Sequence, residues 1–314
     1  MTAAQLADEL RAVGAGSVAT DEALARFTTY RLGGRAAVYV EPADESDILK
    51  MAHVLADRGD VNVLALGRGS NLVISDEGWP GVAVRLGARF SYVAPADGGL
   101  KAGGATALPL LANWAARRGL TGLEFTIAIP GSVGGAVRMN AGAHGRELKD
   151  TLRSVSLCDL ATATLEQRPV EALDLAYRHS GLADTDLVLA AEFDLADEAP
   201  AAVKERMESY RKHRAETQPG ALQNAGSVFR NPPGDHAGRL VEATGLKGFR
   251  VGGARVSELH ANFFIAGPGS TAQDVYDLVA EVRMRVRDAH GIDLTPEIRF
   301  VGAFQAHAGQ VEAR

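Results

Sequence analysis

The sequence predicts a mixed α+β protein, and three observations lead to that fold class. Short apolar runs alternate with an amphipathic helical pattern through the first third of the chain. The clearest helical pattern lies near the C-terminus, at 271–290. Glycine supplies 35 of the 314 residues, about 11% against a typical ~7%, and the glycines fall between apolar segments, as residues of tight turns do.

The first third of the chain alternates strands with helices. A short strand at 38–41 ends at Pro42. The segment 45–58 is expected to be a helix because Ile48, Ala52 and Leu55 share one face, and Gly59 ends it. Further strands are expected at 61–66, 72–74 and 81–86, and a further helix at 106–118.

The rest of the chain adds strands and two long helices. Strands are expected at 154–159, 187–193 and 295–301. The helix at 201–214 is polar, and its basic end suits the negative pole of the helix dipole. The helix at 271–290 carries apolar residues at i, i+3, i+4, i+7 and i+11, and Gly291 ends it. The sequence contains no internal repeat.

Composition excludes several classes of protein. The net charge of −6 disfavours a broad basic face for nucleic acid. A single cysteine, Cys158, excludes an intramolecular disulfide and any multi-cysteine metal site. The eight histidines lack metalloprotease spacing, so no metal site is expected. The N-terminus lacks a signal-peptide pattern and no run approaches the ~20 apolar residues of a membrane span, so we expect a cytoplasmic protein.

The loop at 67–71 follows an expected strand, as a dinucleotide fingerprint would. Leu72 occupies the place of the third glycine and a strand follows, so the fingerprint fails. Two readings stay open at this point. The loop could expose N–H groups to a phosphate or pyrophosphate, or it could be a hairpin turn that uses two glycines.

The densest run of small residues is 129–136, and 139–143 extends it. These segments offer main-chain donors, a serine hydroxyl and an amide, with almost no charge. Such a surface suits a bound cofactor better than acid–base chemistry. No lysine stands at a P-loop position, so ATP hydrolysis is not expected.

Three polar residues are candidates for chemistry, although each alone fits a structural role. Arg178, in the run 177–180, could clamp a carboxylate or form a surface ion pair. Ser227 follows a glycine, but its neighbours do not form a nucleophile elbow. Glu297 follows Pro296 where the last strand is expected to begin, a position at which acids are usually solvated.

Taken together and in order, these motifs resemble the UDP-N-acetylenolpyruvoylglucosamine reductase family. The resemblance runs from 28–34 to 297–300, nearly the whole chain. It rests on GRGSN at 67–71, IPGSVGGA at 129–136, MNAGA at 139–143, YRHS at 177–180, AGSVFRNP at 225–232, HANFF at 260–264 and TPEIRF at 295–300. Only 49 positions separate Arg178 from Ser227, and Tyr210 is the only tyrosine between them. The chain therefore resembles the shorter branch of the family, which lacks an inserted tyrosine loop.

The resemblance implies an FAD-binding two-subdomain fold of the vanillyl-alcohol-oxidase (PCMH) type, with a smaller α+β substrate-binding domain. The first subdomain would be 1–86, joined by the C-terminal segment 293–314. The second would be 87–214, and the substrate domain 215–292. The implied reaction is reduction of the enolpyruvyl ether of UDP-N-acetylglucosamine enolpyruvate to UDP-N-acetylmuramate, in peptidoglycan precursor synthesis.

The same resemblance implies a role for each site residue. Arg178 would bind and polarise the substrate carboxylate, Ser227 would protonate carbon, and Glu297 would assist. FAD, held non-covalently, would lie on Gly67, Arg68, Gly69, Ser70, Asn71, Ile129, Pro130, Gly131, Ser132, Gly134, Gly135, Ala136, Asn140, Ala141 and Gly142. The substrate would also contact Tyr177, Arg214, Arg230, Asn231 and Asn262, and NADPH would be the co-substrate.

Two other hypotheses stay open. An FAD-linked oxidase of the same fold would attach its flavin through histidine or cysteine, or carry a different cap domain. A non-catalytic flavin-binding module would tolerate loss of Arg178, Ser227 and Glu297.

Overall fold

The computed structural model describes residues 2–59, 61–220 and 222–306. The described residues cluster into two compact units. Unit 1 comprises the described parts of Met1–Asp21, Ala37–Arg68 and Gly81–His213. Unit 2 comprises those of Glu22–Ala36, Gly69–Pro80 and Arg214–Arg314. The expected ranges of the two subdomains and the substrate domain stay a prediction, and residues 307–314 of the expected C-terminal segment lie outside the described part.

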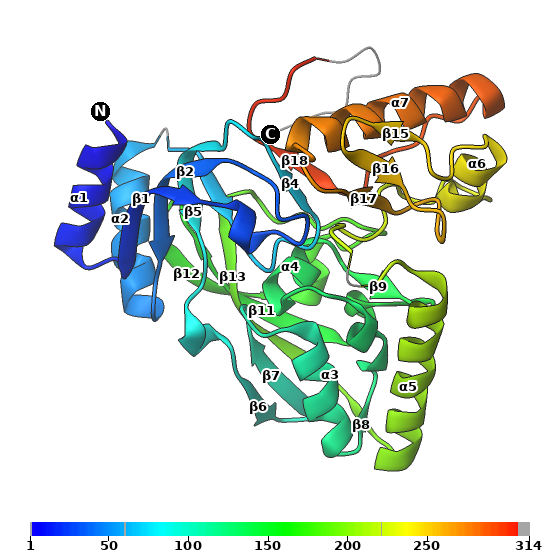
Figure 1. The fold of residues 1–314 in the computed structure, drawn as a ribbon. Helices are drawn as coiled ribbons and strands as arrows, with labels where there is room; N and C mark the ends of the chain where they lie inside the picture. The colour runs from blue at the N-terminus through cyan, green and yellow to red at the C-terminus, as the bar shows by residue number, and fades with distance from the viewer. Residues whose placement is uncertain (1, 60, 221, 307–314) are drawn as a thin grey trace. The chain divides into compact units, whose positions relative to one another are not determined.

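Unit 1 begins with a sheet in the order β1-β2-β5-β3 and two helices. Figure 1 labels both helices and the strands β1, β2 and β5. The strands are β1 (Ser17–Ala23), β2 (Arg35–Glu41), β5 (Trp79–Val84) and β3 (Val63–Ala65), and the helices are α1 (Ala3–Val13) and α2 (Glu45–Arg58). The ends of β1, β2 and β5 cross the boundary between the units. Asp44 accepts a hydrogen bond at the start of α2, and Gly59 ends it with a φ of 72°. Strands β3 and β5 are parallel.

A second sheet of unit 1 is antiparallel, in the order β12-β11-β13-β7-β6. Its strands are β12 (Thr164–Pro169), β11 (Leu152–Asp159), β13 (Asp186–Asp194), β7 (Gly99–Gly103) and β6 (Val93–Ala96). Strand β13 is buried along most of its length, because α2 shares one core with the sheet and α3 (Leu108–Arg117) shares another. Burial on both faces explains the continuous apolar run at 187–191.

The remaining elements of unit 1 are short apart from one helix. They are η2 (Ala88–Phe90), β8 (Leu120–Thr121), η3 (Glu124–Ala128), α4 (Val133–Arg138), β9 (Gly142–Ala143), β10 (Arg146–Glu147), η4 (Leu148–Asp150), η5 (Val170–Leu173) and β14 (Ala196–Asp197). The long helix α5 (Pro200–Thr217) crosses into unit 2 at its C-terminal end.

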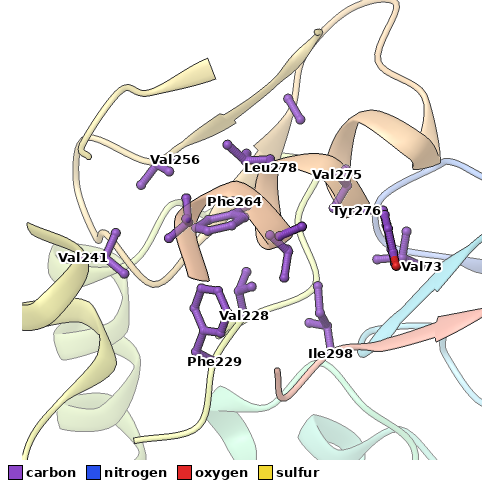
Figure 2. Close-up of a cluster of buried hydrophobic side chains, with 14 of the residues drawn as sticks. Val73, Val228, Phe229, Val241, Val256, Phe264, Val275, Tyr276, Leu278 and Ile298 are labelled. Carbon is purple, nitrogen blue, oxygen red and sulfur yellow. The ribbon is translucent and has the colours of Figure 1, made fainter. Parts of the chain in front are cut away.

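Unit 2 is built around helix α7 (Ala272–His290). The other elements are η1 (Ala25–Phe27), β4 (Leu72–Ile74), α6 (Ala237–Ala243), β15 (Arg250–Val251), β16 (Ala254–Val256), β17 (Phe264–Ala266) and β18 (Arg299–Val301). A sheet β15-β16-β17 lies against α7, and β18 pairs with β4 in parallel (Figure 1). Figure 2 shows the buried cluster that α7 shares with Val228, Phe229, Phe264 and Ile298.

Most predicted elements are confirmed, and the differences have physical reasons. The strand expected at 295–301 is confined to β18, because the stretch before it pairs irregularly with the segment around Phe229 and contains Pro296, which has no N–H. The helix expected at 201–214 runs on to Thr217. The loop 67–71 is not a hairpin turn, because β3 and β4 pair with different partners in different sheets.

Candidate active site

The 67–71 loop divides between the two units. Gly67 and Arg68 follow β3 and belong to unit 1, whereas Gly69, Ser70 and Asn71 lead into β4 and belong to unit 2. Gly69 has a φ of 59°, and a Cβ there would collide with the backbone carbonyl of Phe27. Only glycine satisfies both conditions without strain, so the loop conformation depends on that residue.

The run 129–136 is part loop and part helix. Residues 133–138 form α4, which sequence reasoning missed, and the Ser132 hydroxyl accepts a hydrogen bond from the Gly135 N–H at 3.4 Å to cap it. Ser132 is almost fully buried, at 3% exposure. A Cβ built on Gly67 would lie 2.6 Å from the Ser132 hydroxyl. Within unit 1, the two segments predicted to hold a cofactor therefore lie against each other.

Arg178 stands at the tip of a tight turn in unit 1. The backbones of Ala176 and His179 exchange hydrogen bonds of 3.2 and 3.0 Å, which places Tyr177 and Arg178 between them. Arg178 has a φ of 55°, and its guanidinium lies 4.9 Å from the centre of the Tyr177 ring. Its Nη2 donates to the Gly142 carbonyl at 3.0 Å. The turn thus holds the candidate carboxylate binder against the end of the predicted cofactor segment.

Ser227 and Glu297 lie on neighbouring backbone segments of unit 2. The Glu297 N–H donates to the Val228 carbonyl at 2.7 Å, and Phe229 forms an antiparallel bridge with Pro296. Asn71 joins the same group, because its Nδ2 donates to the Glu297 carbonyl at 3.1 Å. Both Ser227 and Glu297 are half-buried. Unit 2 therefore brings together three residues that the sequence scatters over more than 220 positions.

Asn262 holds the Ser227 segment from the other side. Its Nδ2 donates to the Phe229 carbonyl at 2.8 Å, and its Oδ1 accepts from the Phe229 N–H at 2.9 Å. Ser227 also forms an antiparallel bridge with Phe263. The Asn262 side chain is 4% exposed, so both ends of its amide are engaged by backbone.

The other predicted substrate contacts also lie in unit 2. Asn231 is exposed, and its side-chain oxygen accepts from the Ala237 N–H at 3.1 Å in the first turn of α6. Arg230 is half-buried, and its backbone N–H donates to the Thr295 carbonyl at 2.9 Å. Partial burial lowers the pKa of Arg214, and no carboxylate among the described residues contributes to that shift.

One polar network of unit 1 was not predicted. Arg206 on α5 donates to Glu124 at 2.8 Å and also contacts Glu198, while the Thr121 hydroxyl donates to Glu124 at 2.7 Å. Glu124 opens η3, which leads directly into the segment 129–136. Arg206 and Glu124 stand 82 residues apart, so no local pattern signals the pair.

Comparison with known proteins decides the family. Residues 218–301 match the model of the UDP-N-acetylenolpyruvoylglucosamine reductase C-terminal domain, and 36–167 match that of an FAD binding domain. The chain is 42% identical over 283 residues to the UDP-N-acetylenolpyruvoylglucosamine reductase of Heliobacterium modesticaldum, covering 90% of both chains. It is 38% identical over 296 residues to that of Bacillus subtilis, covering 94% of this chain and 97% of the relative.

The chain belongs to the UDP-N-acetylenolpyruvoylglucosamine reductase family. A solved structure agrees, because the chain superposes on the UDP-N-acetylenolpyruvylglucosamine reductase of Thermus caldophilus with a TM-score of 0.76 at 33% identity, covering 90% of this chain and 98% of that one. Membership confirms the predicted fold class, the FAD-binding fold with a further α+β domain, and makes the chain a flavoprotein oxidoreductase. None of the helices within the described residues is long and apolar enough to cross a membrane.

Proposed function

We propose that the protein reduces the enolpyruvyl ether of UDP-N-acetylglucosamine enolpyruvate to UDP-N-acetylmuramate, with NADPH as reductant and FAD bound non-covalently. Family membership supports the reaction class. The observation that carries the residue assignment is the pairing of the Ser227 and Glu297 segments, which would let one reacting carbon face both side chains.

The two segments expected to hold FAD fit such a ligand. Gly67 approaches Ser132 so closely that a methyl group at residue 67 would collide with the Ser132 hydroxyl. Small residues on both segments leave the backbone accessible to a large, flat, anionic ligand. Gly67, Arg68 and the segment 129–142, all in unit 1, would hold the cofactor, and residues 69–71 remain predicted contacts. FAD, when bound, supplies the hydride that the methylene carbon of the substrate receives.

Arg178 would stabilise the charge that hydride addition creates. Addition at the methylene carbon moves an electron pair toward the neighbouring carbon and into its carboxylate, which gives an enolate-like dianion. A guanidinium held in place before the reaction stabilises that charge without having to reorganise. Arg178 suits this role because it stands on a closed turn and is anchored to Gly142 at 3.0 Å.

Ser227 would then protonate the carbon that bears the carboxylate. A hydroxyl can deliver this proton when it lies within about 3 Å of the carbon. The product gains one hydride and one proton, and the serine recovers its proton from solvent or a neighbour. Glu297, on the adjoining segment, would assist at the same site.

The uridine diphosphate part of the substrate needs cations and amides. Arg230 and Asn231 follow Ser227 by three and four residues, so binding there would fix the distance between the nucleotide and the reacting carbon. Arg214 carries a partly desolvated cation, which an anionic ligand would stabilise. Tyr177, 43% exposed, offers an aromatic face beside Arg178. Asn262 would act through its backbone or by holding the Ser227 segment.

The anaerobic half-reactions test this proposal. The purified protein should be yellow, NADPH should bleach the flavin absorbance, and the enolpyruvyl sugar nucleotide should restore it in the absence of oxygen. UDP-N-acetylglucosamine without the enolpyruvyl group is the matched control and should restore nothing. An oxidase would instead recover its colour efficiently with oxygen alone and ignore the sugar nucleotide, which would contradict the proposal.

A further inference from the structure

We infer that Asn140 is a positioning residue that sets the place of Arg178 relative to the cofactor segment. The inference rests on the proposed role of Arg178. Asn140, Arg178 and the residues that link them all lie in unit 1.

The Asn140 side chain joins three separate stretches of chain. Its Nδ2 donates to the Ala176 carbonyl at 3.0 Å and to Glu147 Oε2 at 3.1 Å. Its Oδ1 accepts from the Lys149 N–H at 3.0 Å. Asn140 is fully buried, at 0% exposure. An amide so placed is fixed in orientation, because turning it over would set donors against donors and acceptors against acceptors.

The bond to Ala176 matters most, because Ala176 begins the turn that presents Arg178. Two further hydrogen bonds attach the same turn to the same stretch of chain. The Ser180 hydroxyl donates to the Arg138 carbonyl at 2.8 Å, and Arg178 itself donates to the Gly142 carbonyl at 3.0 Å. The turn is thus fastened to residues 138–142 at three points, with Asn140 in the middle.

Asparagine satisfies two requirements at this position. Its backbone φ is 39°, in the left-handed region that asparagine and glycine adopt most readily. Glycine would meet the backbone requirement and lose all three side-chain bonds. Aspartate would keep the acceptor for Lys149 but would face the Ala176 carbonyl and the Glu147 carboxylate with oxygen. Asn140→Gly therefore removes the three side-chain bonds without backbone strain. Asn140→Asp replaces the donor of two of them with an oxygen that repels the Ala176 carbonyl and the Glu147 carboxylate.

The half-reactions distinguish positioning from cofactor binding. The Asn140 side chain is buried and bonded to protein, so residue 140 would contact the cofactor only through its backbone, which Asn140→Gly retains. Asn140→Gly should therefore leave flavin content, the flavin spectrum and the rate of reduction by NADPH close to wild type. Oxidation of the reduced protein by the enolpyruvyl substrate should slow by about 10- to 100-fold, because displacement of a clamp by about an ångström costs that much. Asn140→Asp should slow it at least as much. The control is Asn113→Ala, which removes an amide of unit 1 that bonds to Pro109 and Arg211, and it should leave both rates unchanged.

A double variant tests whether Asn140 acts through Arg178. Arg178→Ala should itself slow the oxidation step, and adding Asn140→Gly to it should change the rate by less than about twofold, because coupled residues are not additive. The inference would be overturned if the two substitutions slowed the oxidation step independently, so that their fold-changes multiplied in the double variant. Loss of flavin from Asn140→Gly, or equal slowing of both its half-reactions, would overturn it as well. If Arg178→Ala leaves oxidation intact, the role of Arg178 fails and the inference fails with it.

Ser180→Ala keeps the inference testable should the Asn140 variants not fold. It removes only the bond to the Arg138 carbonyl, and it should slow the oxidation step by about 2- to 10-fold while sparing reduction by NADPH. An unchanged oxidation step in a folded Ser180→Ala protein would overturn the proposed fastening of the turn.

Discussion

Replacing Gly69 by alanine tests how far the loop between β3 and β4 depends on a missing side chain. Two costs combine at this residue. Its φ of 59° disfavours any residue with a Cβ by about 1–2 kcal/mol. The new Cβ would also collide with the Phe27 carbonyl, and forced shifts of this kind cost about 1–3 kcal/mol. Gly69→Ala should therefore lower the free energy of unfolding of unit 2 by about 2–5 kcal/mol.

Gly245→Ala is the matched control in the same unit. Gly245 has a φ of 75°, but nothing lies within 4 Å of a Cβ built there, so only the backbone cost of about 1–2 kcal/mol applies. The two tryptophans separate the units, because Trp79 lies in unit 2 and Trp114 in unit 1. Urea unfolding followed by Trp79 fluorescence, in a Trp114→Phe background, measures the loss. Equal losses for the two variants would refute the contribution of the collision with Phe27.

Three further predictions follow from single side chains. Asn262→Ala should lower the free energy of unfolding of unit 2 by about 2–6 kcal/mol, because the Phe229 N–H and carbonyl each lose a buried partner worth about 1–3 kcal/mol. An unchanged urea midpoint would contradict this. Burial alone would raise the pKa of Glu124, but side-chain hydrogen bonds, including that from Arg206, lower it overall below 4.5. This carboxylate should therefore stabilise unit 1 fully above about pH 4.5 and lose that effect as the pH falls through its folded-state pKa. In urea titrations between pH 7 and 3, Glu124→Gln should reduce the loss of unfolding free energy that the wild type shows as the pH falls. Burial raises the pKa of Cys158 to about 11, so the thiol should resist a disulfide reagent at pH 8 until urea unfolds the protein. Rapid labelling of the folded protein would contradict this.

Local patterns predicted the long elements well and the short ones poorly. Helix α7 matches its predicted range because a sustained apolar face, a Thr271 cap and Gly291 all agree. Helix α4 was missed because two of its six residues are glycine, a poor helix former. It forms because Ser132 caps it and because Val133, Ala136 and Val137 are buried.

The candidate site shows the same division between local and distant information. Motif order pointed to Ser227 and Glu297, but the bridge between Phe229 and Pro296 that makes them neighbours is a tertiary contact without a local signal. The sequence also suggested ligand contacts for Asn140 and Asn262. Their side chains hydrogen-bond to backbone groups far along the chain, which only the folded structure reveals, and their ligand contacts stay a prediction.

Stopped-flow comparison of Ser227→Ala with wild type tests the central claim most directly, that the hydroxyl of Ser227 delivers a proton to substrate carbon. Both proteins are reduced by NADPH and then mixed anaerobically with the enolpyruvyl sugar nucleotide while flavin absorbance is followed. We predict an unchanged rate of reduction by NADPH and a rate of oxidation by substrate that falls by about 100-fold or more. Oxidation at the wild-type rate, or equal slowing of both half-reactions, would contradict it.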